Sequence, residues 1–92
     1  MEVGDYKKKY GETEIALRKF LELYTEKKTP LYDNTINAFE LFEEFKGYLM
    51  GIGMNNEFSM AGMYLMMRLI GFQDVDVHLG KKKSKWLGLK WN

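Results

Sequence analysis

Cysteine is absent from the 92-residue chain, and proline occurs once. Without cysteine the protein has no disulfide scaffold, no thiol nucleophile and no thiolate metal site, which fits a reducing compartment. Long apolar runs are also missing. The longest run of apolar or small residues spans residues 60–67 and ends at Arg68, well short of the roughly 20 residues that a membrane-spanning helix needs. The first residues form no hydrophobic signal region, so we expect an intracellular protein that is neither secreted nor embedded in a membrane.

Acidic residues are absent after Asp76. Residues 77–92 hold five lysines and carry a local charge of +5, whereas residues 1–76 hold nine basic and thirteen acidic groups, a charge of −4; together they give the net charge of +1. A basic end on a nearly neutral chain often indicates a phosphate-bearing partner, with a solvated lysine surface as the alternative. The five lysines are Lys81, Lys82, Lys83, Lys85 and Lys90.

Apolar spacing predicts three helices within a single domain over residues 12–92, preceded by a flexible basic lead-in over residues 1–11. The first helix is expected over residues 12–27 and the second over residues 38–52, because apolar residues recur there at helical intervals. Asn34, Thr35 or Asn37 can cap the second helix, and Asn37 has the capping-box spacing to Glu40. The third helix is expected over residues 57–70, closed by Gly71.

Beyond Phe72 the apolar period changes from helical spacing to strict alternation, which is typical of strands. Two short strands are expected, joined by a turn that contains Gly80 and three consecutive lysines. The order of three helices followed by a basic two-stranded ribbon predicts an α+β, mostly helical protein with the plan of a winged helix-turn-helix domain.

Three stretches resemble a known family. They read Ala38-Phe39-Glu40-Leu41-Phe42-Glu43-Glu44-Phe45-Lys46-Gly47-Tyr48-Leu49, then Ser59 with Met63, Met67 and Gly71-Phe72, and finally Lys82-Lys83-Ser84-Lys85-Trp86-Leu87-Gly88-Leu89. Together they resemble the C-terminal winged-helix domain of poxvirus-type primase-helicases of large DNA viruses, phages and plasmids. The resemblance covers roughly residues 15–91 and rests on apolar spacing.

The resemblance implies an accessory domain beside a helicase, without enzymatic activity of its own, acting on DNA in the replication of a virus or mobile element. It implies a location in the cytoplasm or in a host-cell nucleus or viral factory. DNA, a helicase or primase partner, or a second copy of the chain are the expected partners, and no cofactor is expected. In the family the third helix carries polar residues on its outward face, whereas this chain has apolar residues there and Arg68 as the one cation.

The expected nucleic-acid site lies in the ribbon. Lysines on a turn can reach phosphates without rigid geometry, and Trp86 follows them, where it could stack on an exposed base. Alternatively, the lysines prevent an exposed strand edge from pairing with other chains and aggregating. Alternatively, Trp86 and Trp91 pack in the hydrophobic core beneath the ribbon. The nucleic-acid-binding candidates are Lys81, Lys82, Lys83, Lys85, Trp86 and Arg68.

The alternative function is protein interaction through the methionine-rich third helix, since methionine faces repack against varied partners. The residues expected on that surface are Met60, Leu65, Met66 and Leu69, whereas Met63 and Met67 are expected in the core.

Two further groups of polar residues are expected to be exposed to solvent and not to form a metal or catalytic site. Asp74, Asp76 and His78 alternate along one strand, a spacing too wide for neighbouring residues to share a metal ion easily, so no metal site is expected. The acids of the second helix lie opposite its apolar face without a base or nucleophile beside them, so no catalytic site is expected.

Overall fold

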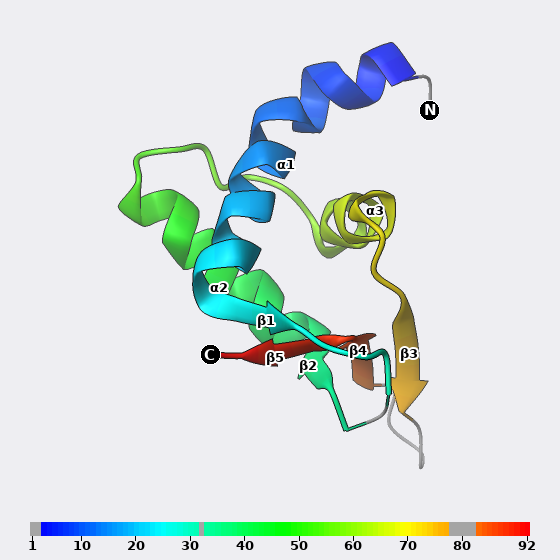
Figure 1. Ribbon diagram of the computed structural model, residues 1–92. Helices are drawn as coiled ribbons and strands as arrows, with labels where there is room; N and C mark the ends of the chain where they lie inside the picture. Colours follow the sequence, from blue (N-terminus) through cyan, green and yellow to red (C-terminus); the bar gives the residue numbers. More distant parts are fainter. Residues whose placement is uncertain (1–2, 32, 78–82) are drawn as a thin grey trace.

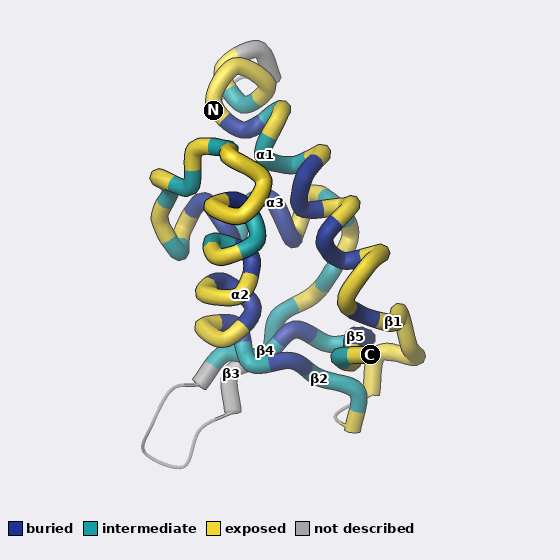
Figure 2. The backbone as a smooth tube through the Cα atoms, turned by 90° about the vertical axis from the view of Figure 1, so that its left-hand side faces the viewer, coloured by how far each residue is buried: buried dark blue, intermediate teal, exposed yellow. Residues whose placement is uncertain are grey.

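The computed structural model describes residues 3–31, 33–77 and 83–92, and shows a mostly helical α+β protein (Figure 1). Within these residues three helices pack above two small antiparallel sheets, and the buried residues line the facing sides of helices and strands (Figure 2). The elements are α1 (Val3–Tyr24), β1 (Thr25–Lys27), β2 (Thr35–Asn37), α2 (Ala38–Gly51), α3 (Met60–Ile70), β3 (Asp74–Val77), β4 (Lys83–Leu87) and β5 (Leu89–Trp91).

Helix α1 begins at Val3, so residues 3–11, which were predicted as a lead-in before the first helix, are part of this helix. Two tyrosines anchor this part of the helix. Tyr10 is buried, and the Tyr6 hydroxyl donates a hydrogen bond to the Glu14 carboxylate two turns later. Burial, together with this hydrogen bond, raises the pKa of Tyr6 well above its ordinary value.

At its other end α1 stops at Tyr24, three residues earlier than predicted, because residues 25–27 form β1. The Thr25 hydroxyl, itself buried, donates to the Leu21 carbonyl at 2.6 Å and so satisfies a group in the last helical turn. The buried face of the helix is also narrower than predicted. Ala16, Leu17, Phe20 and Leu21 are buried, whereas Ile15, Leu23 and Tyr24, which are part of the same apolar pattern in the sequence, are exposed.

Helix α2 agrees most closely with the prediction. Asn37 is its N-cap, and the Asn37 side chain accepts a hydrogen bond from the Glu40 backbone N–H at 3.0 Å. The helix ends at Gly51, one residue before the predicted end. Tyr48 is half-buried, and Ile52, which lies beyond the end of the helix, is exposed. The fully buried residues lie along one face of the helix: Ala38, Leu41, Phe42, Phe45 and Leu49.

Helix α3 begins at Met60 with Ser59 as its N-cap, three residues later than predicted, and ends at Gly71, which has a φ of +122°. Its buried face consists of Gly62, Met63, Met66 and Met67. Met63 and Met67 are buried as predicted, but the buried face also includes Gly62 and Met66, so it is rotated about the helix axis relative to the predicted one.

The predicted two-stranded ribbon is part of a larger arrangement. Strand β4 lies at the centre of a three-stranded antiparallel sheet of order β2-β4-β3, with Ile36 opposite Trp86 on one side and Asp74 opposite Trp86 on the other. Strand β5 leaves this sheet and pairs with β1 in a second, two-stranded sheet. The segments that form β1 and β2 were predicted as helix end and loop, so the sequence analysis missed both strands.

Gly88 separates β4 from β5. Its φ of +81° is a left-handed conformation that glycine adopts without strain. Its N–H donates to the Asn34 carbonyl at 2.7 Å, and its carbonyl accepts from the Lys28 N–H at 2.8 Å. The turn at Gly88 thus directs one continuous stretch of chain into two sheets.

Candidate functional site

The ribbon that carries the predicted phosphate site is the β3–β4 hairpin, in which Val77 pairs with Lys83. Lys81 and Lys82 lie between these two residues in the sequence, outside the described residues, as does the side chain of Lys83. Lys85 is described: it is half-buried in β4, opposite Val75 and Asn37 on the neighbouring strands. Because successive strand residues alternate between faces, Lys85 lies on the face of β4 opposite to Trp86.

Trp86 is fully buried, so the proposed stacking of this residue on an exposed base is wrong. Its ring lies 5.0 Å from the Tyr64 ring of α3, centroid to centroid, and Ile36 beside it in β2 is also buried. Its indole N–H finds no hydrogen-bond partner within the part of the chain that the structure describes. The alternative reading, a tryptophan that seals the core beneath the ribbon, is confirmed.

Arg68 lies at the C-terminal end of α3 and joins this helix to the hairpin. Its Nε donates to the Asp74 carboxylate at 3.0 Å, and its guanidinium lies 5.3 Å from the centre of the Tyr64 ring. The ion pair and hydrogen bond to Asp74 raise the pKa of Arg68 further above its ordinary value. The side chain is still 59% exposed, so its outer nitrogen atoms remain accessible to a ligand.

The predicted partner surface on α3 is only partly exposed. Leu69 is 56% exposed, and Met60 and Leu65 are half-buried. Met66 is fully buried, which contradicts its assignment to this surface. The physical reason is the rotation of the buried face described above, because packing of α3 against both other helices and Trp86 encloses residue 66 along with Met63 and Met67.

No metal site was expected at Asp74, Asp76 and His78, and no catalytic site at the acids of α2. Asp74 is engaged by Arg68, while His78 and the Asp76 side chain lie outside the described residues. In the described part of the chain, no three His, Cys, Asp or Glu side chains gather in a way that could hold a metal ion.

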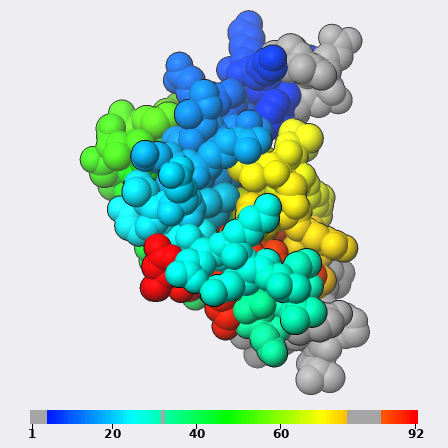
Figure 3. Space-filling view, viewed as in Figure 1, coloured from blue at the N-terminus to red at the C-terminus, as the bar shows by residue number. Residues whose placement is uncertain are grey.

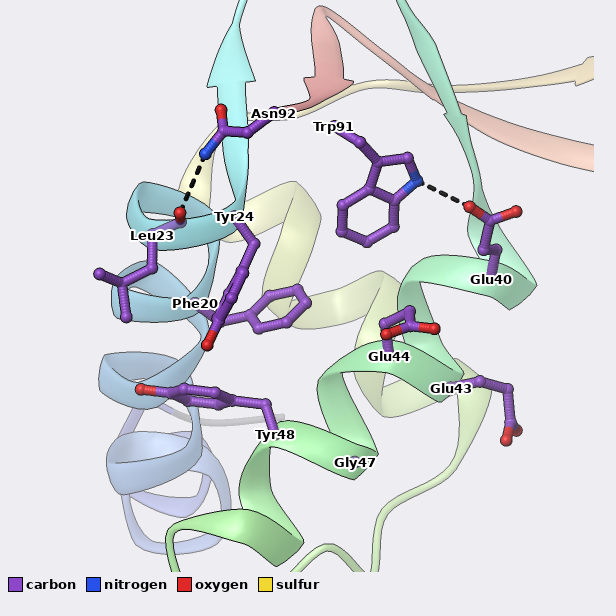
Figure 4. Close-up of a pocket in the computed structure, with 10 residues that line it drawn as sticks. All are labelled: Phe20, Leu23, Tyr24, Glu40, Glu43, Glu44, Gly47, Tyr48, Trp91 and Asn92. Carbon is purple, nitrogen blue, oxygen red and sulfur yellow. Dashed lines mark hydrogen bonds between the residues drawn. The ribbon is translucent and has the colours of Figure 1, made fainter.

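The sequence analysis missed a cavity of about 740 Å³ between α1, α2 and the end of β5 (Figure 4). Aromatic rings from three elements meet there beside glutamates of α2. The signal available in the sequence was Glu40, Glu44 and Tyr48, whose spacing of four places them in one row of a helix. The contribution of Trp91 was not predictable, because it depends on β5 pairing with β1. The lining residues are Phe20, Leu23, Tyr24, Glu40, Glu43, Glu44, Gly47, Tyr48, Trp91 and Asn92.

Comparison of the chain with protein-family models and with curated proteins gave no match. Among the helices of the described residues, none is long and apolar enough to cross a membrane.

Proposed function

We propose that this protein is a winged-helix domain that binds DNA phosphates through its basic β3–β4 hairpin. The observation that supports the proposal best is the antiparallel pairing of β3 with β4, which brackets Lys81 and Lys82 between two paired strands and adds Lys83 and Lys85 on the second strand. The order of three helices and the β2-β4-β3 sheet is compatible with a winged-helix layout.

The binding is expected to be driven by charge and to select little sequence. Lysine contacts to phosphates release counterions and carry no base information, and Trp86, buried in the core, is not available to read or stack on bases. Arg68, on the same side of the molecule as the hairpin, adds one more exposed cation. The resemblance described above suggests replication of a virus or mobile element as the setting, with a helicase or primase as a further partner and no catalytic activity in this domain.

Fluorescence anisotropy with labelled duplex, forked and single-stranded DNA tests the proposal. The variant changes Lys81, Lys82, Lys83 and Lys85 to alanine. Wild-type affinity for duplex should fall about a hundredfold between 50 and 200 mM salt if four phosphates are contacted, and the variant should lose most of this affinity and of its salt dependence.

A charge-matched control removes four exposed lysines from α1, the helix whose N-terminal part lies far from the hairpin (Figure 1): Lys7, Lys8, Lys9 and Lys19. This control should retain wild-type binding. If no DNA form binds at low salt, or if the control loses as much affinity as the hairpin variant, the proposal is wrong.

The second candidate function is docking of a protein partner, or of a second copy, on α3. It is favoured by Leu69, a large apolar side chain that is 56% exposed one turn after half-buried Leu65. The two candidates place different demands on the hairpin variant, because docking on α3 does not require the hairpin lysines and is insensitive to their removal.

A further inference from the structure

The cavity between α1 and α2 is open to the surface beside the C-terminal residues. Figure 3 shows these residues at the surface next to the last turns of α1. Asn92 fixes this end of the chain to α1, since its side-chain amide donates to the Leu23 carbonyl at 2.9 Å and its backbone N–H donates to the Tyr24 carbonyl at 3.0 Å. The cavity of about 740 Å³ is within the size range of small-ligand and side-chain pockets.

Four aromatic rings form the wall of the cavity. Phe20 is central, with ring centroids 5.3 Å from Tyr24, 5.4 Å from Tyr48 and 6.2 Å from Trp91. Tyr24 and Tyr48 also meet edge to face, at 5.9 Å. Tyr24 is 48% exposed, and Tyr48 and Trp91 are half-buried, so a ligand can reach their rings (Figure 4). The negative face of such rings attracts organic cations.

Carboxylates of α2 stand beside this wall. Glu40 and Glu44 are four residues apart, as are Glu44 and Tyr48, so the three side chains form one row on the helix. The Trp91 indole N–H donates to the Glu40 carboxylate at 2.7 Å, which holds both groups at the mouth of the cavity. Figure 4 shows Glu44 on the side of α2 that faces the rings, whereas Glu43 points away from them.

No cation of the described chain compensates these carboxylates. The lining residues include no lysine or arginine, and the ion pairs among the described residues involve other acids: Glu14, Glu26 and Asp74. Lys46, three residues after Glu43, forms no ion pair with it among the described residues, and its ammonium lies over the Phe42 ring, 5.0 Å from its centre. Glu40 and Glu44 thus repel each other along α2, and no lysine or arginine of the described part of the chain neutralises them.

We propose that this cavity binds an arginine side chain of a partner protein. A guanidinium group is planar and weakly hydrated, so it can stack on an aromatic face while its N–H groups donate to carboxylates, which a compact, strongly hydrated lysine ammonium does less well. The rings of Tyr24, Tyr48 and Trp91 supply the faces, and Glu44, with the free oxygen of Glu40, supplies the acceptors.

The site is independent of the proposed DNA contact. The C-terminal end of β5 and the β3 strand lie on opposite sides of the molecule in both Figure 1 and Figure 2. The carboxylates at the cavity would repel a phosphate backbone. Loss of DNA binding on substitution of the hairpin lysines therefore leaves this proposal unaffected, and loss of arginine binding leaves the DNA proposal unaffected.

Nuclear magnetic resonance titration with short blocked peptides tests the proposal on the full chain. The peptides share one sequence around a central arginine, its uncharged isostere citrulline, or lysine, and the Trp91 indole N–H, assigned with Trp91→Phe, is the reporter. The arginine peptide should shift this resonance saturably at millimolar concentration, the lysine peptide should bind more weakly, and the citrulline peptide should not bind.

The contribution of the two carboxylate charges to peptide binding is measured with the double variant Glu40→Gln/Glu44→Gln. In this variant a glutamine side-chain oxygen can still accept the hydrogen bond from the Trp91 indole N–H. This variant should bind the arginine peptide about tenfold more weakly. The control, Glu12→Gln/Glu57→Gln, has the same net charge with both changes outside the cavity, and it should bind within twofold of wild type. Equal binding of the citrulline peptide, an unmoved Trp91 resonance, stronger or equal binding of lysine, or an equal loss in the control would overturn the proposal.

Discussion

At residue 88 a single glycine decides how the end of the chain is distributed between two sheets. A residue with a side chain at this position would be destabilised in two ways, by its backbone conformation and by a steric clash. The φ of +81° is unfavourable for any residue with a Cβ, and a Cβ built at this position lies 3.1 Å from the Lys28 carbonyl oxygen. The carbonyl cannot move easily, because Lys28 is itself hydrogen-bonded to the Gly88 carbonyl.

We predict that Gly88→Ala lowers the free energy of unfolding by about 1–3 kcal/mol, since both the strained φ and the close carbonyl act in the same direction. Urea denaturation followed by circular dichroism measures the change. Gly47→Ala, in the interior of α2 with no atom within 4 Å of the added methyl group, serves as the control and should raise stability by about 0.5–1 kcal/mol. Equal stability of Gly88→Ala and wild type would contradict the prediction.

Single-residue roles were predictable where one local rule decides them. Asn37 caps α2 and Gly71 ends α3, because capping depends on residues close in sequence. Trp86 and Met66 were misassigned because their burial depends on which elements cover them. The sequence is compatible with Trp86 at the surface or in the core. The structure places it in the core, where its ring contacts Tyr64 of α3.

Among the elements, α1 shows how tertiary contact extends a helix beyond its sequence signal. Residues before Glu12 lack a regular apolar stripe, yet Tyr6 and Tyr10 give this part of the helix two anchors. Tyr10 reaches α3 at Gly62, where a Cβ would come within 2.9 Å of the Tyr10 hydroxyl oxygen. The absence of a side chain at Gly62 is what lets the two helices approach this closely.

We predict that Gly62→Ala is destabilising by about 1–3 kcal/mol in the wild-type background, because the buried Tyr10 ring must be displaced. In a Tyr10→Ala background the obstacle is gone, and the same substitution should instead be stabilising by about 0.5–1 kcal/mol through the higher helix propensity of alanine. Chemical denaturation of the four proteins of this double-mutant cycle provides the measurement. An equal cost in both backgrounds would show that Tyr10 and Gly62 are not coupled.

The strands were predictable only where they are long enough to show alternation. The segment after Phe72 changes to a period of two and was expected as a ribbon, but β4 begins at Lys83, which was placed in the turn, and ends at Leu87. β1 and β2 are three residues each, too short to show a period, and exist because β5 and β4 supply their hydrogen-bond partners. The hairpin that carries the proposed DNA site was thus visible in the sequence, whereas the cavity beside β5 was not.

On the scale of the whole molecule, the last residues hold together elements from the first half of the chain. β5 pairs with β1, Leu89 is buried, and Trp91 and Asn92 bond to α2 and α1 respectively. Neither the two-stranded sheet nor the cavity is complete without this segment. The C-terminal strand therefore contributes to the stability of the entire domain as well as to one edge of it.

We predict that removal of residues 89–92 lowers the free energy of unfolding by about 3 kcal/mol or more, since it takes away a buried leucine, three backbone pairings and the contacts of Trp91. Removal of Asn92 alone should cost about 1 kcal/mol, because it takes away only exposed hydrogen bonds to α1. Thermal unfolding monitored by circular dichroism compares the three chains. A full truncation that melts with the wild type would contradict this account.

The late position of β4 and β5 also bears on synthesis in the cell. A ribosome makes β1 and β2 more than forty residues before their partners, and domains fold as units once their parts are available. Until residues 83–91 have left the exit tunnel, Ile36 and the apolar faces of α1 and α2 lack the tryptophan and leucine that cover them. Part of the residues that later form the core is therefore exposed during synthesis. During this interval we expect the nascent chain to bind chaperones that recognise apolar segments.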